Sequence, residues 1–222
     1  MPKSVYLAGP EVFLPNARAA LDAKIALTRA AGLVPISPGD LEFPPTDSKF
    51  DLGLAISEID ERLMNSADAI IANLTPFRGL AADTGTAFEL GYMCAQGKAV
   101  FAYTNVARDH GERTREHFGG VVTIDADGKP RGPDGIMIED LGFIDNLMLH
   151  GGVVRRGGTV VVGNAPPEAL YTDLTAFRQV LAIAAQQLLL NGKGPGMTRA
   201  FRFLWLWSLT ISRPSAPAPA GP

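Results

Sequence analysis

Residues 68–74, Asp-Ala-Ile-Ile-Ala-Asn-Leu, form the stretch of the chain that decides the fold. Residues 69–74 have no charged side chain and all of them except Asn73 are aliphatic, which predicts a strand buried on both faces. A loop follows at 75–84, then a helical pattern at about 86–96, and then a second apolar strand at 99–103. The order strand, helix, strand predicts a parallel pair joined by a crossover helix.

The same alternation continues on both sides of this unit. Further strands are predicted at 4–8, 33–36 and 159–162, and further helices at 16–31, 51–66, 135–150 and 167–190. Residues 121–128 predict a small hairpin apart from the core. We therefore expect an α/β fold with a doubly wound, mainly parallel sheet sandwiched by helices in three layers, flavodoxin- or Rossmann-like.

Composition restricts the partners and the location. The chain has 222 residues, of which 46% are hydrophobic and 19% charged, and its formal net charge is −3. A negative net charge argues against binding of a nucleic acid polymer, which requires clustered Lys and Arg. The single Cys94 cannot form an internal disulfide and no secretory signal opens the sequence, so we expect a cytoplasmic protein.

The C-terminal part differs in composition from the rest. Residues 201–211 are rich in Phe, Trp and Leu, but this run is too short to span a bilayer, so no membrane partner is expected. Residues 213–222 are rich in Pro and Ala, which is typical of a flexible tail. We therefore predict a catalytic domain at 1–191, followed by an apolar segment and tail at 192–222.

Chemistry concentrates around Glu89, which lies early in the predicted helix between Phe88 and Leu90. The positive end of the helix dipole stabilises a carboxylate there, while apolar neighbours remove part of its hydration. These conditions suit a nucleophile. The spacing from Thr86 to Glu89 also fits a capping box, in which Glu89 would only bind the backbone amide of Thr86. Asp83 could likewise be a helix cap or a loop residue, and the local pattern does not decide.

The segment from 83 to 92 resembles the signature of the nucleoside 2-deoxyribosyltransferase family. The matching residues are Asp83, Gly85, Glu89, Leu90, Gly91 and Tyr92. Further matches fall in order over about residues 3–150, and they are Tyr6 on the first strand, Asp60 on the helix before the buried strand, and Asn146-Leu147-Met148. Several separated elements agree in order and spacing, which makes the resemblance specific.

The resemblance implies roles for these residues. Glu89 would attack the anomeric carbon of a 2'-deoxynucleoside, and Tyr6 would hold the carboxylate in line. Asp60 and Asp83 would contact the base and the sugar hydroxyls, one of them moving the base proton. The remaining positions are assigned to substrate binding: Phe13 to stack on the base, Gly9 and Gly85 at the backbone approach, and Asn146 and Met148 closing the sugar side from a neighbouring subunit.

The expected reaction is transfer of 2-deoxyribose between free purine or pyrimidine bases and deoxynucleosides through a covalent intermediate, with retention of configuration. No metal and no cofactor are expected, because the three histidines are scattered and the phosphate-loop and dinucleotide motifs are missing. A homo-oligomer is expected because a neighbouring subunit would complete the site. Two alternatives stay open, namely a hydrolase of deoxynucleoside 5'-monophosphates and a non-catalytic nucleoside-binding protein.

Overall fold

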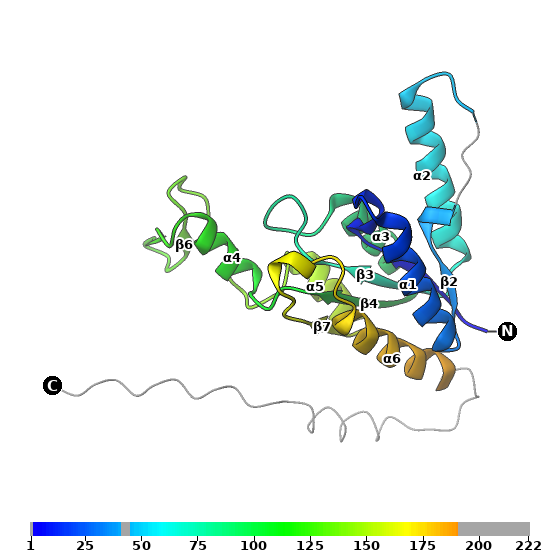
Figure 1. Cartoon of the computed structure of the whole chain (residues 1–222). Helices are drawn as coiled ribbons and strands as arrows, with labels where there is room; N and C mark the ends of the chain where they lie inside the picture. The colour runs from blue at the N-terminus through cyan, green and yellow to red at the C-terminus, as the bar shows by residue number, and fades with distance from the viewer. Residues whose placement is uncertain (1, 41–44, 191–222) are drawn as a thin grey trace. The chain divides into compact units, whose positions relative to one another are not determined.

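A five-stranded parallel sheet forms the centre of this computed structural model, which describes residues 2–40 and 45–190 (Figure 1). Its strands are β1 Ser4–Ala8, β2 Val34–Ile36, β3 Ala69–Asn73, β4 Ala99–Thr104 and β7 Val160–Val162. They lie in the order β2-β1-β3-β4-β7, and every neighbouring pair is parallel. All five residues of β3 are buried, which confirms the prediction for this segment and for the fold class.

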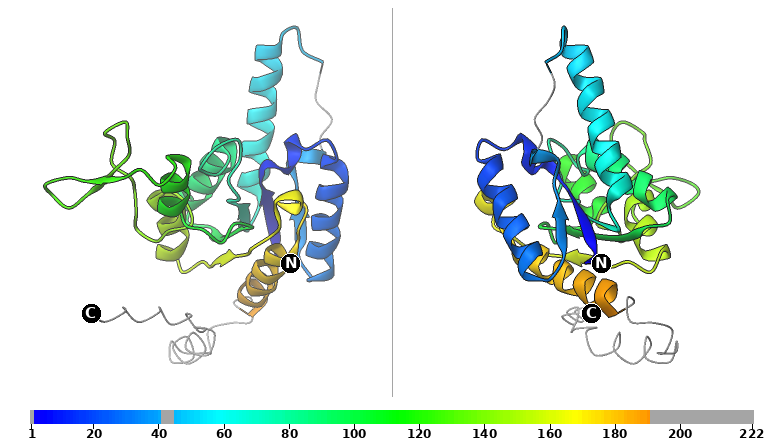
Figure 2. Two further views of the ribbon diagram at one scale, coloured as in Figure 1. Left: turned by 60° about the vertical axis from the view of Figure 1, so that its left-hand side comes forward. Right: turned by 90° about the vertical axis from the view of Figure 1, so that its right-hand side faces the viewer.

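Helices cover both faces of the sheet, as Figure 2 shows from two directions. Residues that alternate along a strand point to opposite faces. Val5 and Leu7 belong to the core beneath one pair of helices, whereas Tyr6 and Ala8 belong to the core beneath the other three. The first layer consists of α1 Ala17–Ala30 and α6 Thr175–Leu190, and the second of α2 Lys49–Ser66, α3 Thr84–Ala95 and α5 Leu147–Arg155.

The topology fixes where a ligand can bind. In this strand order the chain moves from β1 to β2 on one side and returns to β3 on the other, so the switch point lies between β1 and β3. In doubly wound sheets the ligand crevice opens beyond the carboxyl ends of the strands at such a point. The loops there carry a short 3-10 helix, η1 Pro10–Phe13, and residues 74–83 before α3.

Helix α2 contributes little to the core, because Met64 near its C-terminal end is its only buried residue. Its N-terminal half extends beyond the sheet in Figure 1, and Phe50 and Leu54 there are exposed. The C-terminal half packs close enough to α3 that Asn65 accepts a hydrogen bond from Tyr92 at 3.1 Å. This half brings Asp60 toward the sheet.

Two helix predictions are wrong in their bounds. The helix expected at 135–150 begins only at Leu147, because Gly135 and Gly142 have positive φ angles of 75° and 68°, which a right-handed helix does not allow. The helix expected at 167–190 is instead a 3-10 turn, η3 Pro167–Ala169, followed by α6. The Asp173 side chain accepts a hydrogen bond from the Thr175 amide, and this fixes the start of α6.

The polar stretch after β4 contains one helix that composition did not predict. Helix α4 His110–His117 begins with a capping box between Asp109 and Glu112. The expected hairpin is present, with β5 Thr123–Ile124 antiparallel to β6 Pro130–Arg131. The predicted boundary at 191, the aromatic run and the tail lie outside the described residues. Across residues 2–40 and 45–190, no helix has both the length and the apolarity that crossing a membrane requires.

Candidate active site

Tyr6 and Glu89 meet beside the switch point. Tyr6 lies on β1 with its ring completely buried, and its hydroxyl donates a hydrogen bond of 2.6 Å to Oε1 of Glu89. Glu89 is partly buried in the second turn of α3. Strand β1 and helix α3 pack through the core that contains Tyr6 and Leu90, which holds the two side chains in register. The contact brings together residues 83 positions apart in the sequence.

The alternative role of Glu89 as a capping-box residue is contradicted by the position of the helix start. Helix α3 begins at Thr84, so Thr86 lies inside its first turn. The cap is Asp83, whose Oδ2 accepts hydrogen bonds from the Thr86 amide at 2.9 Å and from its hydroxyl at 3.1 Å. This cap satisfies the amide that Glu89 would have bound, and the Glu89 carboxylate is directed to Tyr6 instead.

Acidic residues surround Glu89. Burial raises the pKa of Glu89 to about 7, the Tyr6 hydrogen bond opposes this shift, and the charges of Asp60 and Asp83 reinforce it. Burial also raises the pKa of the Tyr6 hydroxyl far above its ordinary range, with Glu89 and Asp60 adding to the effect. A carboxyl group that titrates near neutral pH in a cluster of acids is typical of a functional site.

Asp60 on α2 lacks a partner where one is expected. Its Oδ1 is buried and has no hydrogen bond, and burial raises the pKa of the carboxyl group. Buried polar atoms in proteins nearly always have a partner, so an unpartnered carboxylate oxygen beside other acids points to a donor supplied by a ligand. Asp60, Asp83 and Glu89 thus come from α2, the α3 cap and α3 itself, and the charges of the two aspartates act on Glu89.

Phe13 ends η1 with 56% of its surface exposed. Its ring stacks on Phe77, with the centroids 5.4 Å apart and the planes 20° apart. The guanidinium of Arg78 lies 5.9 Å from the Phe13 centroid and 5.0 Å from that of Phe77. Arg78 adopts a φ of 52°, which is uncommon outside glycine. The loops after β1 and β3 therefore present an aromatic and cationic platform, and sequence patterns pointed only to Phe13.

Asn146 and Met148 lie together at the start of α5. Asn146 caps the helix, because its Oδ1 accepts from the Met148 amide at 3.0 Å and its Nδ2 donates to Glu139 at 2.9 Å. The Met148 side chain is 71% exposed. The expected contact of Met148 with a neighbouring subunit stays a prediction, and the exposed side chain is accessible for such a contact.

The two glycines expected near the substrate differ in their surroundings. A Cβ atom on Gly9 would lie 2.0 Å from Oε2 of Glu11 and 2.9 Å from Cβ of Asn73, so only glycine fits there. A Cβ atom on Gly85 would lie 3.1 Å from Oδ2 of Asp83 and meet nothing else. Close packing by the chain itself explains Gly9, and the role of Gly85 stays a prediction.

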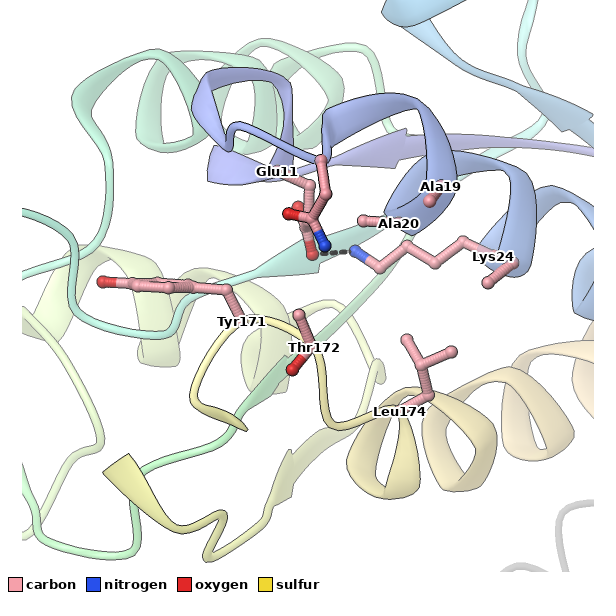
Figure 3. Close-up of a pocket in the computed structure, with 9 residues that line it drawn as sticks. Glu11, Ala19, Ala20, Lys24, Tyr171, Thr172 and Leu174 are labelled. Atoms are coloured by element: carbon pink, nitrogen blue, oxygen red, sulfur yellow. Dashed lines mark hydrogen bonds and ion pairs between the residues drawn. The ribbon is translucent and has the colours of Figure 1, made fainter. Parts of the chain in front are cut away.

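Glu11 forms a second carboxylate centre, on the opposite face of the sheet. It is 1% exposed and pairs with the Nζ of Lys24, which is 2% exposed (Figure 3). Its Oε1 also accepts from Nδ2 of Asn73 at 2.8 Å and from the hydroxyl of Tyr103 at 3.1 Å. The pair borders a cavity of about 170 Å³ between α1 and the segment that precedes α6, and no predicted site residue lines this cavity.

Fold and site together define a doubly wound α/β protein with an acidic cluster at the switch point of its sheet. Residues 5–148 match the family model described as nucleoside 2-deoxyribosyltransferase. The match covers more than half of the chain, and the chain belongs to this family. Members of the family are enzymes that act on nucleosides and bases.

Three individual proteins show how far the similarity extends. An uncharacterized protein of Schizosaccharomyces pombe is 34% identical over 181 residues, which cover 77% of this chain and 86% of that protein. The solved 2-desoxiribosyltransferase from Leishmania mexicana is 31% identical, with a TM-score of 0.50, and the match covers 78% of this chain and 97% of that one. A conserved protein from Enterococcus faecalis shares the fold, with a TM-score of 0.53 at 16% identity over 85% of this chain and 99% of that one.

Proposed function

We propose that this chain transfers 2-deoxyribose between nucleobases by a retaining double displacement in which Glu89 is the nucleophile. The observation that carries the proposal is the buried hydroxyl of Tyr6 bound at 2.6 Å to a carboxylate surrounded by acids. The hydrogen bond fixes one oxygen of Glu89 and leaves the other, Oε2, without a hydrogen bond in the described residues. An oriented, partly desolvated carboxylate suits attack on an anomeric carbon.

In the first half-reaction, Oε2 of Glu89 attacks the anomeric carbon of a bound deoxynucleoside. A carbon–oxygen bond forms while the carbon–nitrogen bond breaks, and the electron pair of that bond leaves with the base. We assign Asp60 as the group that protonates the departing base; in the reactive form, Asp60 carries the one proton that the acidic cluster shares and Glu89 is ionised. Burial favours the protonated form of Asp60, and its Oδ1 has no donor. The product is a deoxyribosyl ester of Glu89.

In the second half-reaction, a nitrogen of another purine or pyrimidine base attacks the same carbon. The ester bond breaks, Glu89 leaves as a carboxylate, and Asp60 takes the proton that the incoming base loses. Two inversions at one carbon retain the configuration. Attack by water in place of the base would give hydrolysis, so the chemical outcome depends on how well the acceptor base fills the site.

Sugar and base would contact different elements. Asp83 keeps Oδ1 free while Oδ2 caps α3, which allows it to accept a hydrogen bond from a sugar hydroxyl. Phe13 would stack on the base at the exposed edge of its pair with Phe77. The mechanism uses no metal and no cofactor, because the anion of Glu89 itself stabilises the positive charge that develops on the sugar.

We also propose a homo-oligomer in which α5 of one subunit closes the sugar side of its neighbour's site. Leu147, Met148 and Val154 are exposed on α5, and Phe88 is exposed on α3, which packs against it. Apolar side chains gathered on adjacent helices favour association. A cytoplasmic location is consistent with one buried, unpaired cysteine, Cys94. Light scattering of the purified chain tests the assembly, and a monomer would contradict it.

A base-exchange assay tests the function. The protein is incubated with a deoxynucleoside and a different free base, and formation of the new deoxynucleoside is compared with release of base from a deoxynucleoside 5'-monophosphate. We expect exchange to be the faster reaction. Faster hydrolysis of the nucleotide would identify the chain as a hydrolase and not a transferase. Binding without either reaction would identify a nucleoside-binding protein.

A further inference from the structure

A buried ion pair lies next to the acidic cluster without belonging to it. Arg113 on α4 and Asp145, just before α5, have side chains that are 6% and 0% exposed. Nη2 of Arg113 lies 3.7 Å from Oδ2 of Asp145. Charges buried this deeply cost free energy unless their neighbours satisfy them. Both side chains bond almost entirely to backbone groups, and this choice of partners indicates what the pair does.

Asp145 joins two segments that are distant in the sequence. Its Oδ2 accepts a hydrogen bond from the Ala82 amide at 2.8 Å, and its Oδ1 accepts one from the Asn146 amide at 2.7 Å. Ala82 immediately precedes Asp83, the cap of α3. Asn146 is itself the cap of α5. One carboxylate therefore holds the backbone at the N-terminal ends of both helices.

Arg113 binds the same two segments through their carbonyl groups. Its Nε and Nη2 donate to the Leu80 oxygen at 3.0 and 2.9 Å, and Nη2 also donates to the Ile144 oxygen at 2.8 Å. A further bond from Nη1 to the Arg108 oxygen, 2.7 Å long, ties the guanidinium to the start of its own helix. Each segment thus gives an N–H to Asp145 and a C=O to Arg113.

We propose that Arg113 and Asp145 are positioning residues that hold the start of the Glu89 helix in register with the end of α5 that this chain supplies to its neighbour's deoxyribose site. The inference rests on the proposed function. On one side the pair fixes Ala82, and with it the Asp83 cap and the helix that carries Glu89. On the other side it fixes Asn146, and with it the Met148 end of α5. Neither charged group touches the substrate.

The arrangement matters because the two segments are loops, and apolar packing alone holds a loop backbone loosely. A planar guanidinium and a carboxylate give bonds of fixed direction to opposite loops. Displacement of a reacting group by about 1 Å can cost on the order of 10²-fold in rate. An element that holds both loops to each other therefore acts on kcat through Glu89 and Asp83.

The test replaces Asp145 by Asn and uses Asp140→Asn as the matched control. An amide oxygen can accept from only one of the two backbone N–H groups, and the NH2 group would face the other. Asp140 also pairs with an arginine of α4, Arg115, and its side chain is 31% exposed, but it does not link the two loops. Each variant thus loses one Asp–Arg pair between α4 and the segment that precedes α5.

We expect Asp145→Asn to lower kcat for base exchange at least tenfold while KM for the deoxynucleoside changes less than threefold. Asp140→Asn should change both constants less than twofold. Circular dichroism at the assay temperature gives the folded fraction of each variant. Wild-type kcat in Asp145→Asn, or a loss that only matches its unfolded fraction, overturns the positioning role.

Arg113→Lys is the second variant. A lysine keeps the positive charge but cannot place four directed bonds on three carbonyl groups, so kcat should fall here too, with Arg115→Lys as the control. If neither Asp145→Asn nor Arg113→Lys folds, the pair is a folding element and the proposal is wrong. A wild-type protein without base exchange would instead refute the proposed function, and that result is independent of these variants.

Discussion

Glu11 and Glu89 are two carboxylates near the same end of the sheet, one on each face, and their surroundings are opposite. Glu11 is 1% exposed, and its neighbours are a lysine ammonium, an amide and a phenol that all donate to it. Glu89 has one donor, Tyr6, and its charged neighbours are Asp60 and Asp83. No cation pairs with Glu89 in the described residues.

The difference in partners distinguishes a carboxylate that stabilises the fold from one that serves a reaction. A buried carboxylate with a cation and several donors has its charge satisfied by the fold itself. A carboxylate among other acids is electrostatically unfavourable, and proteins keep such groups where a ligand or a reaction needs them. On this comparison, Glu11 holds η1 to α1, β3 and β4, whereas Glu89 is held ready for a substrate.

Glu89→Ala should give the largest effect. We expect base-exchange turnover to fall at least about 10³-fold, because the nucleophile acts in the transition state. Binding of the deoxynucleoside should persist, since most ground-state contacts come from other residues. Initial-rate kinetics together with calorimetric titration measure the two quantities. Retained turnover would remove Glu89 from the mechanism.

Substitution by Gln should change stability with opposite sign at the two glutamates. Glu11→Gln breaks a buried ion pair and leaves Lys24 uncompensated, which should cost about 3–5 kcal/mol of unfolding free energy. Glu89→Gln removes a charge that the fold disfavours, so Tm above pH 7 should rise by about 2–4 °C for each kcal/mol recovered. Thermal unfolding of both variants decides. An equal fall of Tm in both variants would contradict the expected difference between the two glutamates.

The pH dependence of the Glu89 effect follows from its pKa, which folding raises from an ordinary 4.5 to about 7. The folded state therefore binds the proton more tightly, and its stabilising contribution is complete below pH 4.5 and lost as the pH rises through 7. The Tm gain of Glu89→Gln should accordingly vanish below pH 4.5. A gain of the same size at pH 4 and pH 8 would have another cause.

Phe13→Ala should have an intermediate effect. Loss of a base-stacking ring costs on the order of 1–3 kcal/mol, so KM for the deoxynucleoside should rise roughly tenfold with a smaller change in kcat. Phe50→Ala on α2 is the control, because Phe50 is also exposed and lies outside the predicted site. Equal effects of the two substitutions would argue against a base platform at Phe13.

The smallest effects concern the pH profile of kcat/KM. The reactive form carries one proton on the acidic cluster, with Glu89 ionised and Asp60 protonated, so kcat/KM should fall along a limb near pH 7, where the cluster loses that proton. Tyr6→Phe removes the hydrogen bond that lowers the pKa of Glu89, and the limb should move to higher pH. Asp60→Asn removes a negative charge that raises this pKa, and the limb of the residual activity should move lower. If both substitutions moved the limb in the same direction, the Tyr6 hydrogen bond and the Asp60 charge would not have opposite effects on the pKa of Glu89.

The fold could be predicted from local patterns because buried parallel strands leave continuous apolar runs such as 68–74. The predicted helix bounds were wrong where turns in the backbone, and not the apolar pattern, determine where the helix begins. Gly135 and Gly142 interrupt an otherwise helical pattern, and their positive φ values follow from turns that periodicity does not record. The start of α4 is marked in the sequence by Asp109 and Glu112, which form a capping box. This pattern was overlooked because the surrounding stretch is polar and rich in glycine.

The site could be predicted in part. Glu89 and Tyr6 came from a resemblance, and their 2.6 Å contact across 83 positions depends on strand and helix packing that local sequence cannot supply. The capping alternative for Glu89 could be rejected only when the structure placed the helix start at Thr84. The roles of Lys24 and Arg113 were missed, because each is a buried cation whose acidic partner is distant in sequence or in another element.

The proposed mechanism requires a covalent bond between Glu89 and the sugar. The most direct measurement is mass spectrometry of the intact and digested protein after incubation with a slow 2-fluoro-deoxynucleoside analogue. We expect one added fluorinated sugar per chain, located on Glu89 and missing in Glu89→Gln, while Glu11→Gln still carries it. A protein that exchanges bases yet carries no adduct, or carries it on another residue, would contradict the account.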